Sequence, residues 1–150
     1  MTIERTLEDR MKRDWDLIRK QLTDIEEDKD VLADLPPKPP KWEDDELEAD
    51  FMARLHAHEA IEERILGHLE LLTESGYVDG LRVTRGASGH FMVSRSKPRL
   101  TMEGHDLLDT MRSATVWNTI KDTAQKKGIE LSFEAIKALG AFALKQVLGG

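Results

Sequence analysis

The stretch GHLELLTESGYVDG, residues 67–80, decides how the rest of this sequence is interpreted. Its leucines continue a helical spacing that begins upstream, and Gly76 stands where a left-handed residue commonly ends a helix. The stretch therefore predicts an amphipathic helix that ends at Gly76. The apolar residues that mark this helix are Ile61, Ile65, Leu69 and Leu72.

The residues just upstream predict a second, shorter helix. Its apolar residues recur at steps of one, three or four, and the segment HAHE, residues 56–59, supplies a turn between the two helices. Two short helices joined in this way are the signature of a helix-turn-helix. The apolar residues of the upstream helix are Leu47, Phe51, Met52 and Leu55.

The residues after Gly80 predict a β-hairpin, which corresponds to the wing of a winged helix-turn-helix. Residues 81–85, LRVTR, and residues 90–94, HFMVS, alternate apolar and polar side chains, as half-buried strands do. Between them, GASG supplies turn glycines. The residues expected on the apolar side are Leu81, Val83, Phe91 and Val93.

The first 35 residues predict a long helix with one narrow apolar stripe. We favour packing of this stripe on the domain over pairing with a second helix as a short coiled coil. Prolines in PPKPPK, residues 36–41, end the helix and form a stiff spacer, for which a proline-rich ligand motif is the weaker alternative. The stripe consists of Leu7, Met11, Trp15, Ile18, Leu22 and Ile25.

Three helices are expected after the hairpin. Thr101 caps the first, the second contains Trp117 and stops at Gly128, and Ser132 opens the last. The last helix, within residues 133–150, is apolar around much of its circumference. This breadth indicates burial on two sides, either in the core or at a homodimer interface.

These elements predict a mostly α fold with a small β-hairpin wing. It consists of a winged helix-turn-helix core, a long N-terminal helix and two C-terminal helices. The expected parts of this one compact unit are an N-terminal helix at 1–35, a proline-rich, acidic linker at 36–44, a winged-helix core at 45–112 and a C-terminal helical segment at 113–150.

The composition favours a cytoplasmic protein. The 150 residues include no cysteine, which excludes disulfides and thiolate chemistry. No apolar run approaches the roughly 18–20 residues of a membrane span, and no signal peptide opens the chain, so no membrane partner is expected. Charge is distributed unevenly: residues 1–78 carry 11 Lys and Arg against 22 Asp and Glu, and residues 79–150 carry 11 against 7.

Four glutamates give the helix before Gly76 an acidic face on the side opposite its apolar stripe. Carboxylates repel phosphate, and reading a DNA groove needs Arg, Lys, Asn or Gln, so this face disfavours DNA reading by the helix. We expect it to bind a basic surface of another protein, although a merely solvated face is the simpler alternative. The four residues are Glu59, Glu63, Glu70 and Glu74.

The predicted wing has the opposite charge. Residues 81–99 contain five cations and no acid, so the wing could grip the phosphates of duplex DNA. The alternative is a charged strand edge that prevents aggregation. The five cations are Arg82, Arg85, Arg95, Lys97 and Arg99.

Neither catalysis nor a cofactor is expected. HEAIE, residues 58–62, resembles the start of a zinc-hydrolase motif, but Glu62 stands where the second histidine must be, so no metal site is expected. His68 is interpreted as a packing residue, and His105 as a local hydrogen-bonding partner of the backbone or of Asp109.

Four blocks of the sequence resemble an uncharacterised family of small phage and prophage proteins, a domain of unknown function. The blocks begin at Met11, Gly67, Leu100 and Leu131, and the most specific are LTMEGHDLLD and VWNTIK. The segment from GYV through the hairpin to LTMEGHDLL is also similar to winged-helix regulators. The resemblance implies a winged-helix fold and a phage or prophage origin, and it carries over no catalytic residues.

The sequence thus leads us to expect a non-enzymatic winged-helix binding protein. The first hypothesis is a protein-interaction module that regulates or inhibits a host or phage protein, for example at a nucleic-acid-binding site. The alternative is a DNA-binding regulator that uses the basic wing. A homodimer through the N- or C-terminal helices is compatible with either hypothesis.

Overall fold

The structure is a computed structural model that describes residues 12–36 and 38–149. The predicted mostly α fold with a single small β-hairpin is confirmed for these residues. The stripe residues Leu7 and Met11 lie outside them. The elements are α2 (Trp15–Glu26), α3 (Glu48–Glu74), β1 (Val78–Arg85), β2 (Phe91–Leu100), α4 (Met102–Arg112), α5 (Ala114–Lys127) and α6 (Phe133–Val147).

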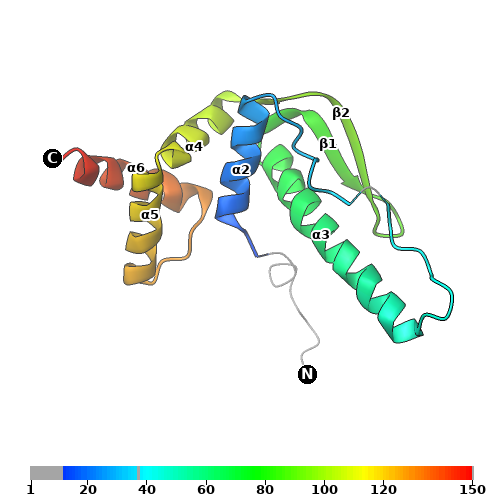
Figure 1. Cartoon of the computed structure of the whole chain (residues 1–150). Coiled ribbons are helices and arrows are strands. Elements are labelled where there is room, and N and C mark those ends of the chain that lie inside the picture. The colour runs from blue at the N-terminus through cyan, green and yellow to red at the C-terminus, as the bar shows by residue number, and fades with distance from the viewer. Residues whose placement is uncertain (1–11, 37, 150) are drawn as a thin grey trace.

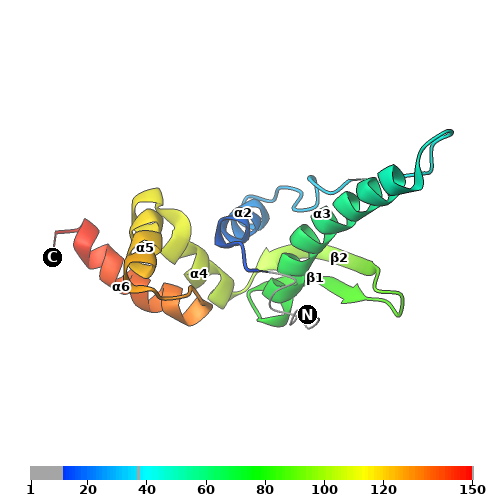
Figure 2. The ribbon, with the colours of Figure 1, turned by 90° about the horizontal axis from the view of Figure 1, so that it is seen from below.

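The molecule is elongated, with α2 near its middle. Helices α4, α5 and α6 gather at one end, whereas α3 and the hairpin extend together toward the other end (Figures 1 and 2). None of the helices in the described ranges is long and apolar enough to cross a membrane.

The helix-turn-helix expected within residues 47–76 is absent, because α3 is one continuous helix of 27 residues. The predicted turn at HAHE was wrong: this segment contains neither glycine nor proline, and Ala57 within it and Ala60 after it favour helix. His58 is buried, and its Nε2 lies 2.9 Å from the Glu62 carboxylate one turn later. Ile61, expected in the core, is 43% exposed.

The N-terminal helix is shorter than predicted. The side chain of Asp14 accepts a hydrogen bond from the Leu17 amide and caps α2, which ends at Glu26 rather than near residue 35. Asp28 has φ +61°, a left-handed conformation in which a helix cannot continue. Of the predicted stripe, the described members Trp15, Ile18, Leu22 and Ile25 are all buried.

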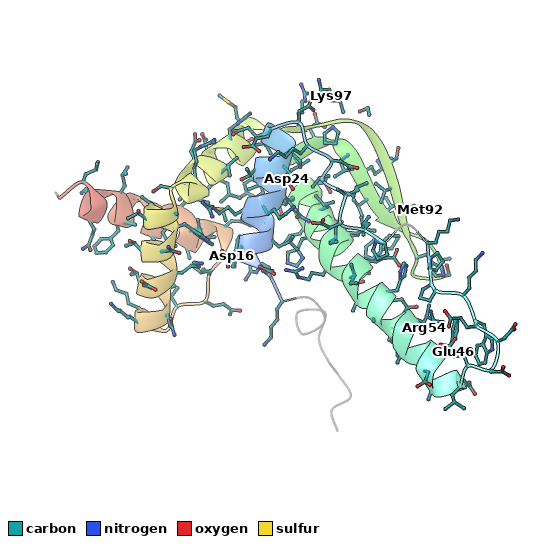
Figure 3. The ribbon with its side chains drawn as sticks, viewed as in Figure 1. Asp16, Asp24, Glu46, Arg54, Met92 and Lys97 are labelled. Carbon is teal, nitrogen blue, oxygen red and sulfur yellow. The ribbon has the colours of Figure 1, made fainter. Side chains whose placement is uncertain are left out.

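The linker is fastened to α3 rather than serving only as a spacer. Arg54 Nη2 lies 2.7 Å from Glu46 Oε1 and donates a hydrogen bond to the Lys41 carbonyl at 2.8 Å. Glu46 and Arg54 lie together near the free end of α3 (Figure 3). The indole of Trp42 packs against Phe51, with ring centroids 5.0 Å apart and an interplanar angle of 47°.

The hairpin is antiparallel, with register running from Val78 opposite Leu100 to Arg85 opposite Phe91. The alternation predicted the sides correctly for Leu81 and Val83, which are both buried. The helix before the hairpin ends as expected: Gly76 has φ +81° and follows the last residues of α3.

The C-terminal helices begin at the predicted caps. The Thr101 hydroxyl accepts from the Gly104 amide, and the Ser132 hydroxyl accepts from the Ala135 amide. Within the chain, only one side of α6 is buried, and Ile136 and Ala143 lie on that side. The expected burial on two sides therefore does not occur inside a single chain.

Candidate functional site

The predicted acidic face is divided between solvent and the hairpin. Arg85 of β1 donates hydrogen bonds to both carboxylate oxygens of Glu63, at 2.9 and 3.2 Å, and reaches Glu70 Oε1 at 3.3 Å. Glu59 and Glu74 are exposed, and their side chains have no hydrogen bond or ion pair within the described residues. The expectation that all four carboxylates point away from the protein was therefore wrong for Glu63 and Glu70.

Strand alternation explains this arrangement. Arg85 has the same parity as Leu81 and Val83, so its side chain lies on the face of β1 that packs against α3. The guanidinium also lies 4.4 Å from the centroid of Phe91, its cross-strand neighbour. Hydrogen bonding to the Glu63 carboxylate raises the pKa of Arg85. Parity alone could have placed Arg85 on this face from the sequence.

The other predicted wing cations differ in their surroundings. Arg99 Nη2 lies 2.9 Å from Asp79 Oδ2 across the hairpin, and this hydrogen bond lowers the pKa of Asp79. Arg82 and Lys97 are exposed and have no acidic partner in the described part of the chain. Lys97 lies on the part of β2 nearer α4 (Figure 3). The side chain of Arg95 lies outside the described residues.

The contrast between Arg85 and Arg82 gives a test of this arrangement. Replacing Arg85 with methionine should lower the free energy of unfolding by about 1 kcal/mol, because two partly exposed ion pairs and a ring contact are lost. Arg82→Met, on the opposite face of the same strand, should leave the free energy of unfolding unchanged. Urea denaturation measures both values, and equal losses would contradict the placement of Arg85.

Between α3 and the hairpin turn lies an open cleft of about 200 Å³. Carboxylates from two successive turns of α3 form one wall, and the turn between the strands forms the other. Glu59 is without a partner among the described residues, whereas Glu62 contacts His58 and Glu63 contacts Arg85. We call this site the acidic cleft, and its lining residues are Glu59, Glu62, Glu63, Ser88, Gly89, His90 and Phe91.

The charge of the acidic cleft suits a cation rather than an anion. Carboxylate oxygens accept hydrogen bonds from ammonium and guanidinium groups, and their charge repels phosphate. No group of three or more His, Cys, Asp or Glu residues that could hold a metal ion occurs in residues 12–36 and 38–149.

His68 does more than fill space, which sequence reasoning did not anticipate. It is 1% exposed, its Nε2 accepts from the Asp14 amide at 2.8 Å, and its Nδ1 lies 2.6 Å from the Arg64 carbonyl. Arg64 Nη2 also lies 2.6 Å from Asp14 Oδ2. These contacts fasten the start of α2 to α3. Burial lowers the pKa of His68, against the opposing effect of its hydrogen bond to Arg64.

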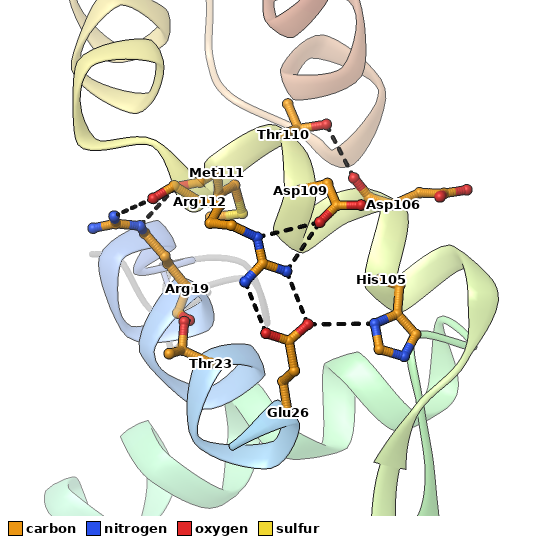
Figure 4. A network of polar contacts seen from close by, with 9 residues as sticks. All are labelled: Arg19, Thr23, Glu26, His105, Asp106, Asp109, Thr110, Met111 and Arg112. Atoms are coloured by element: carbon orange, nitrogen blue, oxygen red, sulfur yellow. Dashed lines mark hydrogen bonds and ion pairs between the residues drawn. The ribbon is translucent and has the colours of Figure 1, made fainter.

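His105 contacts a different partner from the expected one. Its Nδ1 lies 3.5 Å from Glu26 Oε2 at the end of α2, rather than near Asp109. Asp109 is instead bound by Arg112 Nη2 at 2.9 Å, and Arg112 also forms two 2.8 Å hydrogen bonds with Glu26 (Figure 4). These hydrogen bonds raise the pKa of Arg112 and lower that of Glu26.

Arg19 also links α2 to α4, but here the cation belongs to α2 and the acceptors belong to α4. Arg19 of α2 donates to the carbonyls of Met111 and Arg112 at 2.7 and 3.0 Å, and so satisfies the last turn of α4 (Figure 4). The block LTMEGHDLLDTMR thus fixes α4 against α2 and the hairpin. His105 and Arg112 of this block contact Glu26 of α2, and no residue of the block lines the acidic cleft.

Comparison with known proteins places this chain beside a described family and a bacterial relative. Residues 12–130 match the model of a family described as "Hypothetical protein (DUF2513)". An uncharacterized protein of Haemophilus influenzae is 30% identical over 138 residues, which cover 92% of this chain and 99% of that protein. No solved structure matches.

Proposed function

The chain belongs to the DUF2513 family, and we propose that it is a non-enzymatic protein whose acidic cleft binds a basic segment of another protein. The observation that supports this most strongly is the position of Glu59. It is exposed at the mouth of a cleft that already contains two further carboxylates, and it has no partner in the described part of the chain.

A lysine or arginine side chain of a partner is the group that fits. Of the three carboxylates, Glu63 forms an ion pair with Arg85, and Glu62 contacts His58 Nε2. Glu59 therefore supplies the charge that an incoming cation would neutralise, while the others can accept hydrogen bonds from it. The opposite wall offers the backbone of the hairpin turn, which allows further hydrogen bonds to a peptide.

We propose a winged-helix-type scaffold for this binding surface, with α3 followed by the hairpin and α2 packed beside α3. The scaffold would belong to a phage or prophage protein that regulates or inhibits a bacterial protein in the cytoplasm. Because α3 has no internal turn, the likeness rests on the order of α3 and the hairpin alone.

Charge reversal at the cleft should weaken partner binding. We expect Glu59→Lys to reduce affinity about tenfold or more, because it places a cation where the partner's cation must lie. Glu74→Lys is the matched control, since Glu74 is also exposed and its side chain has no partner among the described residues, but it does not line the cleft. The measurement is capture of a bacterial partner from nuclease-treated lysate, followed by titration of the purified pair.

A hexalysine peptide provides a second readout that needs no identified partner. In the wild type it should shift the backbone amide resonances of Glu59, Ser88 and His90, and in Glu59→Lys these shifts should be lost. If both reversals weaken capture equally, binding depends on general acidity rather than on the cleft. If neither reversal does so, the cleft is not the binding site.

Duplex DNA remains the second candidate ligand because Arg82 and Lys97 are exposed on the hairpin without an acidic partner in the described ranges. Pairing of Glu63 and Glu70 with Arg85 also weakens the argument from repulsion against DNA. Retardation of duplex DNA at low salt, lost in the Arg82→Glu, Lys97→Glu double variant and retained in Glu59→Lys, would favour this candidate.

A further inference from the structure

The outer side of α6 is an apolar surface on which no described helix or strand packs, although Lys127 Nζ lies 5.6 Å from the centroid of the Phe142 ring. The helix packs on the core through Ile136, Gly140 and Ala143 and lies at the end of the molecule (Figures 1 and 2). On the solvent side, Phe142 is 45% exposed and Leu144 is 50% exposed. We define the α6 outer face as Glu134, Ala138, Ala141, Phe142, Leu144 and Lys145, all of which are exposed.

The positions of the residues on this face are symmetric about the middle of the helix, with opposite charges at the two ends. At 100° per residue, Glu134, Ala138, Ala141 and Lys145 lie within about 60° of one another around the helix. The two alanines are at its centre, with Glu134 four residues before the first and Lys145 four residues after the second. A second copy of α6, laid antiparallel across this centre, would therefore place each charge opposite its complement.

We propose that the protein forms a homodimer through this face, with the two α6 helices antiparallel. Glu134 of each chain pairs with Lys145 of the other chain, and Ala138 lies against Ala141 of the other chain. The two ion pairs are separated by about 16 Å, the rise of eleven helical residues. An interface of this kind is isologous, so each pair occurs twice.

The alanines and the flanking apolar residues explain why the helices can meet closely. Alanine at the crossing point allows helix axes to approach to the short end of the usual range, about 8 Å. Phe142 and Leu144 then lie beside the contact and lose exposed apolar surface. Neither Glu134 nor Lys145 has an ion-pair partner among the described residues, so both are available to a second copy.

This inference does not depend on the acidic cleft, since α6 lies at the opposite end of the molecule (Figure 2). A dimer would present two acidic clefts, one at each far end. A result that excludes the dimer would not affect the proposed function. A result that excludes binding at the acidic cleft would not affect the dimer.

Sedimentation velocity with charge-reversed variants tests the dimer. The wild type should shift from monomer to dimer as its concentration rises into the micromolar range. Glu134→Lys alone and Lys145→Glu alone should each weaken association about tenfold or more, because like charges then face each other twice. An equimolar mixture of the two variants should associate about as strongly as the wild type, since every pair in the mixed dimer is then complementary.

All the substituted side chains are exposed, so circular dichroism should confirm that each variant keeps its helical content. A wild type that stays monomeric at hundreds of micromolar would overturn the proposal. So would a dimer that both reversals leave unchanged, or single variants whose mixture does not restore association. A parallel arrangement would bring like charges together in the wild type itself, so a wild type that associates no more strongly than the single variants would contradict the antiparallel order.

Discussion

Replacing Gly104 with alanine should lower the free energy of unfolding by about 2–3 kcal/mol, although alanine is the better helix former. Gly104 lies in the first turn of α4, directly against the start of the hairpin. A β-carbon there would overlap the carbonyl oxygen of Tyr77 and would stand 3.3 Å from Cβ of Leu100. The closest atoms belong to the backbone of Tyr77, so no side-chain rotation relieves the obstruction.

The sign of the effect separates two physical causes. In a helix, a change from glycine to alanine stabilises by up to about 1 kcal/mol when nothing obstructs the methyl group. At Gly104 the added methyl must push α4 away from Tyr77, whose carbonyl also accepts a hydrogen bond from the Thr101 amide at 3.1 Å. The clash therefore outweighs the propensity.

Thermal unfolding of the variant measures this effect. A loss of 2–3 kcal/mol in a chain of this size corresponds to a fall in Tm of roughly 5–10 °C. Met102→Ala is the control on the same turn of α4, because Met102 is 77% exposed and its removal should change Tm little. A Gly104→Ala protein that melts higher than the wild type would contradict the close approach of α4 to Tyr77.

Local signals in the sequence predicted much of the fold. At Thr101 and Ser132 a hydroxyl residue precedes an apolar helical pattern, which predicts a helix cap. Each hydroxyl accepts a hydrogen bond from the backbone amide three residues later. The hairpin followed from alternation and turn glycines in the same way. Such features depend on residues close in the chain, and tertiary contacts did not override them.

The sequence pattern also indicates that α3 is one continuous helix, which the predicted turn at HAHE did not take into account. A single helical stripe, with steps of four, three, seven and four residues, runs along α3. Its members are Phe51, Leu55, His58, Ile65 and Leu69. The predicted turn at HAHE left this histidine out of the stripe. With its Nε2 near the Glu62 carboxylate, it is compatible with a buried position.

Contacts between distant segments could not be obtained from the pattern. Parity places Arg85 on the helix-facing side of β1, but only the packing of the hairpin on α3 brings it to Glu63 and Glu70. Likewise, nothing near His105 indicates Glu26, which is 79 positions earlier. Charge patterns along a helix therefore predicted an exposed acidic face that the fold partly neutralises.

Replacing His68 with leucine should lower the free energy of unfolding at pH 7 by about 2 kcal/mol. The side chain is fully enclosed, and leucine fills a similar volume without a hydrogen-bond acceptor. The Asp14 amide, which donates to His68 Nε2 at 2.8 Å, would then lose its partner at the start of α2. Removing the acceptor of a partly buried donor costs its desolvation energy, and this accounts for the expected size.

The stability of the wild type should also fall as the pH is lowered through 6.5. Burial holds the pKa of His68 below its ordinary value of 6.5. The hydrogen bond between its ring and the Arg64 carbonyl and the charge of Asp14 oppose this effect, and the charge of the Arg64 guanidinium adds to it. Below pH 6.5 the unfolded chain binds a proton at this position that the folded chain does not bind. Stability then decreases toward acid, by up to about 1.4 kcal/mol per pH unit, until the folded pKa is reached.

The leucine variant lacks this titration, so the difference in stability between wild type and variant should narrow from pH 7 to pH 5. Carboxylates with lowered pKa values, such as Asp14 and Glu26, lose their contribution only at lower pH and are present in both proteins. His56→Gln is the matched control, since His56 is an exposed histidine of the same helix. It should reproduce the stability of the wild type at both pH values. A difference between wild type and His68→Leu that stays constant or widens toward pH 5 would show that His68 accepts a proton in the folded protein, which its contact with the Asp14 amide forbids.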